Sequence, residues 1–333
     1  MPRYLRLGFL DNTKRAFWLL AIVYSHTILR FLYSKAKAVV RFATGTSELL
    51  RVVNDGLATG SGGGAWTAHV DSAQKREPRS ARPSPAAVFR IDQCLLHSKR
   101  LVLERRSIEA GSTSGLSDEH VTRILTKKLF PPAPSPQALL LKDTLRIIAA
   151  SFTLMHSLNA RATTKYDKEN KTHERLLLEF WALAMPDEKL KSRVSDQWQK
   201  VGFQGTDPAT DFRGMGLLGL DDLVYYAKTH PTSFQRVLES SKHGSAWFSM
   251  AIVGINITAF ALSLVRQRGL QKFFFKYGTS KEVYHEFYCF VFDTFERKWT
   301  SQNTFLTVMD FERVFKVFQR DLEERLETQI FEV

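Results

Sequence analysis

Residues 198–223 read WQKVGFQGTDPATDFRGMGLLGLDDL, and this stretch is unlike either a regular helix or a strand. Its recurring glycines permit backbone conformations and close approaches that a side chain blocks. Asp207-Pro208 and Thr210-Asp211 are residue pairs typical of turns and helix caps. A cation, Arg213, follows them, and helical spacing of apolar residues resumes after Gly219. The stretch therefore predicts an ordered loop, packed by aromatic residues, that presents one arginine at the start of a helix.

Three of these glycines, Gly214, Gly216 and Gly219, match the spacing of the dinucleotide-binding fingerprint. That fingerprint needs a buried strand before it and a βαβ unit around it. The preceding residues, Asp-Pro-Ala-Thr-Asp-Phe-Arg, do not make a buried strand. We therefore do not predict a nucleotide site in this chain.

The longer pattern WxxVGFQGxDPxTDFRGMGxLGL, residues 198–220, resembles the ELMO domain, and within that group the ELMO-domain-containing proteins. The similarity runs from about His173 to about Trp299 and takes in Phe180-Trp181, Ala251–Thr258 and Phe287–Cys289. The resemblance implies a GTPase-activating protein for Arf-family (Arf and Arl) small GTPases, with Arg213 required for activity. It also implies no cofactor of the chain's own, because Mg-GTP is held by the partner GTPase.

Two roles are open for Arg213. An arginine supplied in trans to a GTPase is worth about 10³–10⁵ in rate, and the planar, always-charged guanidinium suits that task better than an ammonium. Alternatively, Asp211 or a glutamate of another helix pairs with Arg213, which is then a buried brace for the loop. The family's requirement for the arginine does not separate the two roles, because removing a brace also abolishes activity.

The rest of the motif supplies the candidate partner-binding residues around catalytic Arg213. Its aromatic side chains are expected to fix the loop by packing. Gln204 either assists near the phosphate or the attacking water, or caps backbone groups of the loop. The candidate residues are Trp198, Gly202, Phe203, Gln204, Gly205, Asp207, Pro208, Thr210, Asp211, Phe212, Gly214 and Gly216.

The net charge of +13 gathers at one end of the 333-residue chain. Residues 1–110 hold eighteen basic and eight acidic side chains, so ten of the thirteen excess charges lie in the first third. Positive charge spread over a core domain would have indicated nucleic acid, and we predict no nucleic-acid partner. A basic segment beside apolar residues is typical of a membrane surface or an import signal. Two cysteines, Cys94 and Cys289, make no disulfide framework and indicate a reducing compartment.

Near the N-terminus, residues 16–33 read AFWLLAIVYSHTILRFLY and are flanked by cations. Polar interruptions leave this run marginal for a membrane span, which needs about 20 mostly apolar residues. Three alternatives stay open: a helix on a membrane surface, a helix packed onto the globular domain, and a targeting or spanning segment. The resemblance favours the first, since ELMO-domain-containing proteins are linked to intracellular membranes. We expect residues 1–45 to attach a cytoplasmic protein peripherally to endoplasmic reticulum, Golgi or mitochondria.

The remaining composition predicts an all-α chain, because helical spacing recurs and no alternating strand pattern appears. Residues 58–87, rich in Gly, Ser, Pro and Arg, are expected to be a disordered linker. We assign residues 88–165 to a helical extension and 170–327 to a multi-helix ELMO domain. Within it, Ala246–Val265 is apolar almost all round and is predicted to be a buried central helix rather than a membrane span.

Other chemistries find no support in the sequence. It contains no P-loop pattern, no His-Glu-x-x-His and no Gly-x-Ser-x-Gly. His285 and Cys289 share a helix face but supply too few ligands for a metal site, so none is predicted. Two other functions remain as alternatives to GTPase activation in small-GTPase signalling and vesicle traffic. One is a non-catalytic scaffold or adaptor that binds a small GTPase or its regulators, and the other is a membrane organiser built on the N-terminal third.

Overall fold

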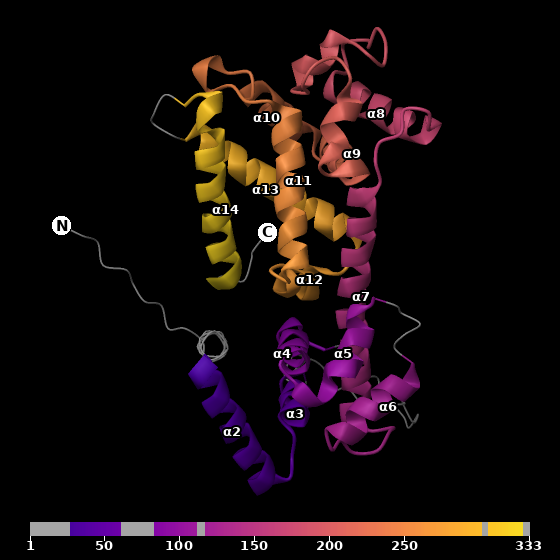
Figure 1. Cartoon of the computed structure of the whole chain (residues 1–333), viewed down its shortest axis with the longest axis vertical. Coiled ribbons are helices and arrows are strands. Elements are labelled where there is room, and N and C mark those ends of the chain that lie inside the picture. Colours follow the sequence, from indigo (N-terminus) through magenta and orange to yellow (C-terminus); the bar gives the residue numbers. More distant parts are fainter. Residues whose placement is uncertain (1–26, 61–82, 112–116, 302–305, 329–333) are drawn as a thin grey trace, which may run out of the picture.

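The computed structural model describes residues 27–60, 83–111, 117–301 and 306–328. Within these ranges the chain folds into α- and 3-10 helices with no strand, so the all-α prediction is confirmed for them. Two helical bodies lie one above the other along the long axis (Figure 1).

The N-terminal body contains the helices before residue 135 and the first half of α7. It comprises α2 (Thr27–Thr44), α3 (Glu48–Gly60), α4 (Pro85–Leu96), η1 (Lys99–Leu101), α5 (Val102–Glu109) and α6 (Asp118–Lys127), followed by α7 (Pro136–Thr163). The C-terminal body comprises α8 (Lys171–Ala184), η3 (Asp196–Val201), η4 (Pro208–Arg213), α9 (Gly216–Thr229), α10 (Pro231–Ser240), η5 (Gly244–Ala246), α11 (Met250–Arg266), α12 (Gln271–Tyr277), α13 (Lys281–Thr300), η6 (Val308–Asp310) and α14 (Phe311–Thr328).

Helix α7 belongs to both bodies. Its first half buries Leu141 and Leu145 in the N-terminal core, and its second half buries Leu154 and Leu158 in the C-terminal core. The helix has 28 residues and is therefore about 42 Å long. Residues 88–165, which we expected to form an extension outside the ELMO domain, thus share a continuous helix with it.

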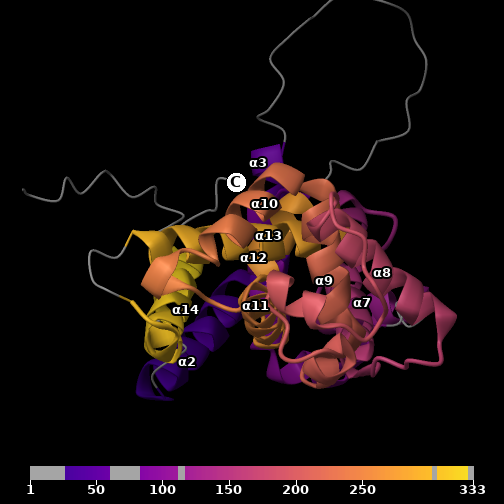
Figure 2. The same cartoon turned by 90° about the horizontal axis from the view of Figure 1, so that it is seen from above.

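The central helix of the C-terminal body is α11. Figure 2 shows it between α14 on one side and α9 and α7 on the other. Its few polar side chains are satisfied within the fold: Asn256 Nδ2 donates to the Ile252 carbonyl at 2.9 Å, and Thr258 Oγ1 donates to Asp222 Oδ2 at 2.7 Å. The prediction of a buried central helix is therefore confirmed. No single helix in the described part of the chain is long and apolar enough to cross a membrane; α11 and α12 pass that test only together, and they meet at 91°.

Two sequence-based boundaries need correction. The expected linker, residues 58–87, overlaps the end of α3 and the start of α4, where Pro85 occupies the first turn behind the cap residue Ser84. Ala87 is buried. Residues 61–82 of the expected linker lie outside the described residues, as do residues 1–26 of the expected N-terminal helix.

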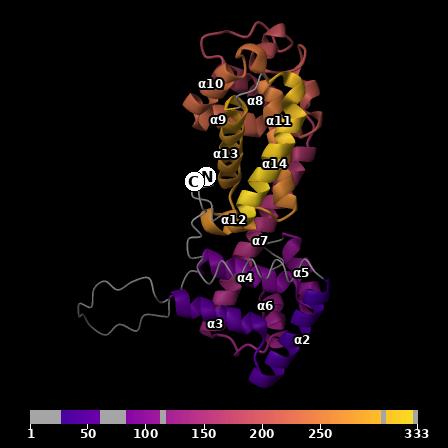
Figure 3. The same cartoon turned by 90° about the vertical axis from the view of Figure 1, so that its left-hand side faces the viewer.

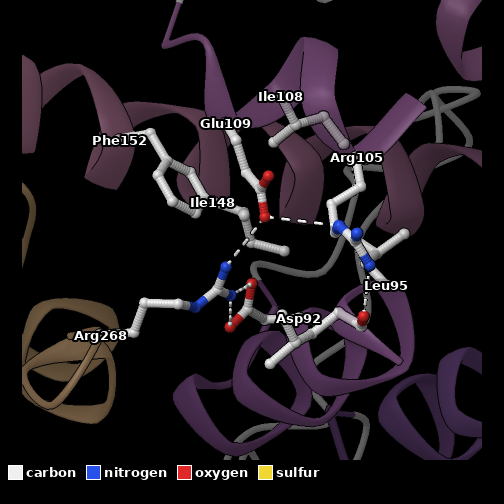
Figure 4. Close-up of a pocket in the computed structure, with 9 residues that line it drawn as sticks. Asp92, Leu95, Arg105, Ile108, Glu109, Ile148, Phe152 and Arg268 are labelled. Atoms are coloured by element: carbon white, nitrogen blue, oxygen red, sulfur yellow. Dashed lines mark hydrogen bonds and ion pairs between the residues drawn. The ribbon is translucent and has the colours of Figure 1, made fainter. Parts of the chain in front are cut away.

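A buried ion pair joins the two bodies (Figure 4). Arg268, which follows α11, donates to both carboxylate oxygens of Asp92 on α4 at 2.6 and 2.7 Å. Its guanidinium also lies 5.0 Å from the centre of the Phe152 ring and 3.4 Å from Glu109. The space beside these groups has a volume of about 10 Å³, room for about one water, so it is a packing gap and not a ligand pocket.

Replacing Arg268 should destabilise the whole chain. The Asp92 side chain is only 2% exposed, so Arg268→Met leaves a buried carboxylate without its cation, at a cost of about 3–5 kcal/mol. Urea unfolding followed by circular dichroism measures the loss. The matched control, Arg313→Met, breaks an exposed pair with Asp310 and should change stability by less than about 1 kcal/mol. Equal losses in the two variants would show that the Arg268 pair contributes nothing beyond a surface contact.

Candidate functional site

The loop that carries Arg213 is fixed at its first end by Gly202. This glycine has a φ of +86°, and a Cβ there would stand 2.2 Å from the backbone nitrogen of Met250 and 2.7 Å from the carbonyl carbon of Ser249. These atoms belong to the start of α11, whose Ile252 amide donates to the Gly202 carbonyl at 3.3 Å. The Gly202 carbonyl thus accepts a hydrogen bond from one of the amides at the N-terminus of the central helix, which have no partner within that helix.

The other end of the loop is fixed by Gly216, the first residue of α9. With a φ of +50°, its Cβ would lie 2.4 Å from the Thr164 carbonyl oxygen and 2.6 Å from that of Ala162. The neighbouring Leu217 amide donates to the Thr164 carbonyl at 2.9 Å, at the C-terminus of α7. One turn later, Asp221 accepts two hydrogen bonds from Arg161 of α7, at 2.5 and 2.7 Å. The C-terminal end of the loop is therefore held on the end of the helix shared by the two bodies.

Between these two points, aromatic rings form a floor beneath the loop. The ring centres of Trp198 and Phe203 are 5.6 Å apart, and those of Phe203 and Phe212 are 5.5 Å apart, in both cases edge to face. Trp198 Nε1 also donates to the Arg193 carbonyl at 2.8 Å. Pro208, in the same loop, is also buried. These four side chains and Gly216 are buried, so we revise their expected contact with a partner: they position the loop instead. We assign the same role to the partly buried Gly202, because it is pressed against α11.

Two carboxylates hold the polar part of the loop. Asp207 caps η4 by accepting the Ala209 amide at 3.1 Å, and it pairs with Arg193 at 2.8 Å. Thr210 Oγ1 donates to the Asp207 carbonyl at 3.0 Å. Asp211 Oδ2 accepts a hydrogen bond from the backbone amide of Gln204 at 2.9 Å, which joins the two sides of the loop. Burial raises the pKa of Asp211, while this hydrogen bond and the charge of Arg213 oppose the rise.

The Arg213 side chain is exposed at the end of η4. Over the described residues it has no hydrogen bond and no ion pair, although its charge acts on the nearby Asp211. Neither Asp211 nor a glutamate of another helix neutralises it, so the buried-brace alternative is wrong for this conformation. The exposed residues beside it are Gln204, Gly205, Thr210 and Gly214, and these are the motif residues that a partner can touch.

Three residues that support the loop were not predicted from the sequence. The Tyr166 ring stacks on Phe212 at 6.1 Å, and Tyr166 lies between the expected extension and the expected ELMO domain. Trp181 packs edge to face on Trp198 at 5.2 Å, and Arg193 holds Asp207. Phe180-Trp181 is one of the residue pairs that carry the ELMO resemblance, which was a signal for Trp181. Tyr166 and Arg193 had no such signal, because the contacts that place them are made only in the folded chain.

Asp222 of α9 and the polar side chains that face it are already paired with each other. His285 Nδ1 lies 2.7 Å from Asp222 Oδ1, and Thr258 donates to the same carboxylate. Burial raises the pKa of Asp222, and His285 opposes the rise. Cys289 is buried in the core. Among residues 27–60, 83–111, 117–301 and 306–328, no group of three or more His, Cys, Asp or Glu side chains is arranged to hold a metal ion.

Comparison with known proteins places this helical fold and its glycine-rich loop in one family. Residues 156–315 match the ELMO/CED-12 family, and this range takes in the C-terminal end of α7, from residue 156, and the whole arginine loop. The chain belongs to this family.

Its similarity to individual members extends well beyond the loop. It is 36% identical to ELMO domain-containing protein 2 of Homo sapiens over 216 residues, 63% of this chain and 72% of that protein. The identity to the same protein of Bos taurus is 35% over 213 residues, with the same coverage. It is 29% identical to ELMO domain-containing protein 1 of Mus musculus over 320 residues, 90% of this chain and 89% of that protein.

The motif glycines should differ sharply in their tolerance of alanine. Gly202→Ala forces a Cβ into backbone atoms of α11 and should cost at least about 3 kcal/mol. Gly214 has a helical φ of −80° and open space where a Cβ would be, so Gly214→Ala should change stability by less than about 1 kcal/mol. Thermal and urea unfolding of the two variants measures the difference. Similar losses would mean that Gly202 is not pressed against α11 in solution.

Proposed function

We propose that this chain is a GTPase-activating protein for an Arf-family (Arf or Arl) small GTPase, to which it supplies Arg213 in trans. Membership of the ELMO/CED-12 family supports the broader role of a small-GTPase regulator. The observation that carries the finer proposal is the placement of Arg213: its side chain is exposed, without an ion-pair partner over the described residues, on a loop fixed at both ends.

The chemistry follows from where charge develops. As the γ-phosphoryl group leaves, negative charge grows on its oxygens and on the leaving oxygen, and a guanidinium placed there stabilises it. A rate gain of about 10³–10⁵ corresponds to roughly 4–7 kcal/mol of barrier. Stabilisation of this kind is largest when the donor is already in position. The two glycine contacts and the aromatic floor provide that positioning, while Mg-GTP stays on the GTPase.

Two neighbours of Arg213 complete the proposed contact surface. The Gln204 side chain is exposed while its backbone amide is held by Asp211, so its amide group is free to assist near the phosphate or the attacking water. Gly214 needs neither a positive φ nor a close contact within the fold. We attribute its glycine to close approach by the partner, since a residue without a Cβ lets another backbone come near.

Arg213→Lys should slow activated GTP hydrolysis about a thousandfold, because an ammonium cannot reproduce the guanidinium fork. Unfolding should be unchanged, since the side chain is exposed. Single-turnover hydrolysis on a panel of GTP-loaded Arf and Arl proteins measures the rate. The matched control is Arg320→Lys, an exposed arginine on α14, which should keep full activity. Full activity of the Arg213 variant with a normal fold would remove this residue from any catalytic role.

Gly214→Ala should weaken function while leaving the fold intact. A methyl group between the two backbones should raise the GTPase concentration for half-maximal activation at least about tenfold, the effect of about 1.4 kcal/mol. Titration of the GTPase in the hydrolysis assay gives this value. Gly269→Ala, at an exposed glycine with only ordinary contacts, is the control. Unchanged activation by Gly214→Ala would place the partner elsewhere.

The alternative function, a non-catalytic scaffold or adaptor, gives a different result in the same assay. A scaffold binds a GTP-loaded GTPase without changing its hydrolysis rate, and Arg213→Lys then affects neither the binding nor the rate.

We further propose that the chain meets its GTPase at an intracellular membrane of the endoplasmic reticulum, Golgi or mitochondria, where vesicle traffic is regulated. Residues 1–45 would provide the attachment.

A further inference from the structure

Helix α2 has its apolar side facing outward. Residues 28, 32, 35, 39 and 42 recur at helical spacing and form one stripe along it, and four of the five are large and apolar. These four side chains are well exposed: Ile28 75%, Leu32 56%, Val39 67% and Phe42 94%. Figure 3 shows α2 at the lower end of the molecule, below α5 and α6. This orientation is the reverse of that in α14, which buries its apolar residues Phe315, Phe318 and Leu322 in the core.

The opposite, polar side of α2 is the one that contacts the body. Tyr33 OH donates to Glu48 Oε1 at 2.8 Å, and Lys37 Nζ lies 2.7 Å from Glu48 Oε2 at the start of α3. Lys37 also lies 4.2 Å from the centre of the Tyr33 ring. These contacts hold the helix in register with its polar side inward. The apolar stripe is therefore left for something outside the chain's described part, because the fold uses the other side.

Charge identifies the occupant. Helix α2 has no acidic residue, and Lys35 lies within the apolar stripe itself. Further along, Arg41 is close enough to Lys128 for its charge to act on that lysine, as does the charge of Arg100. An apolar stripe accompanied by cations fits an anionic lipid surface, where side chains enter the acyl boundary and ammonium groups meet headgroups. A second copy of the chain would instead bring like charges together.

We propose that the outward stripe of α2 is a membrane-contact face that selects anionic lipid. The same geometry places the arginine loop far from it. The α3 residue Asn54 accepts a hydrogen bond from Gln137 at the start of α7 at 3.2 Å, whereas Gly216 lies against Thr164 at its end. These two ends of α7 are about 40 Å apart, and Figure 1 shows α2 in the body at the α3 end. This inference does not depend on the proposed GTPase activity.

Vesicle flotation of the full chain tests the proposal. The wild-type protein should bind vesicles of phosphatidylcholine with phosphatidylserine, bind phosphatidylcholine vesicles more weakly, and lose affinity as salt rises. Combining Leu32→Ser, Val39→Ser and Phe42→Ser should weaken binding about tenfold or more for each side chain removed from the lipid. Lys35→Glu should weaken binding to the anionic vesicles alone. These side chains are exposed, so circular dichroism should show an unchanged fold.

The control replaces exposed apolar residues elsewhere: Val308→Ser with Met309→Ser in η6 should leave vesicle binding unchanged. In a Cys94→Ser background, a fluorophore at Phe42→Cys should be quenched by nitroxide lipid, and one at Gln204→Cys should not. Three results would overturn the proposal: no vesicle binding by the wild type, binding unchanged in the triple variant, or a wild-type dimer that the triple variant dissociates without any vesicle binding. In an assay without vesicles, the triple variant should activate GTP hydrolysis by a soluble GTPase as well as the wild type does. A failure of the membrane proposal can therefore be told apart from a failure of the proposed GTPase activation.

Discussion

The structure depends on two places where backbone meets backbone without room for a side chain. At Gly202 the loop lies on the beginning of α11, and at Gly216 it lies on the end of α7. Helix ends carry unpaired amides and carbonyls, and the loop pairs with both: Gly202 accepts the Ile252 amide and Leu217 donates to the Thr164 carbonyl. These two contacts fix both ends of the segment that carries Arg213. The intervening residues are then ordered by a short aromatic floor and two carboxylates.

In this arrangement, one set of side chains holds the loop in place and a different set is exposed to solvent. Phe203 and Phe212 are buried in the core, and Asp211 accepts a hydrogen bond from the Gln204 amide. The side chains that remain exposed are therefore polar or absent, with Arg213 at their centre. An exposed cation without an ion-pair partner costs little in water, and its charge stays available for a bound anion. The exposure of Arg213 and the burial of its neighbours thus have the same structural origin.

Much of the fold follows from local pattern, and much of the site does not. Helical spacing identified the class, and the even distribution of apolar residues identified α11 as central, because both signals are carried by neighbours in sequence. The aromatic packing of Trp198 and Phe212 was also predictable from their place in a glycine-rich loop. The exposure of Arg213, the support from Tyr166 and the pair of Arg268 with Asp92, 176 residues apart, depend on which helices meet. The continuity of α7 across two cores was hidden for the same reason.

That shared helix has a consequence for how the molecule opens. Fluctuations that expose amides usually follow cooperative units of structure, and α7 cannot fray from its N-terminal end without disturbing Leu141 and Leu145, nor from its C-terminal end without releasing Gly216. The slowest hydrogen exchange is therefore expected near the middle of α7, around Phe152, where Arg268 also rests. Binding of a ligand to either body would therefore be expected to raise the amide protection of the other, because one continuous helix is packed into both.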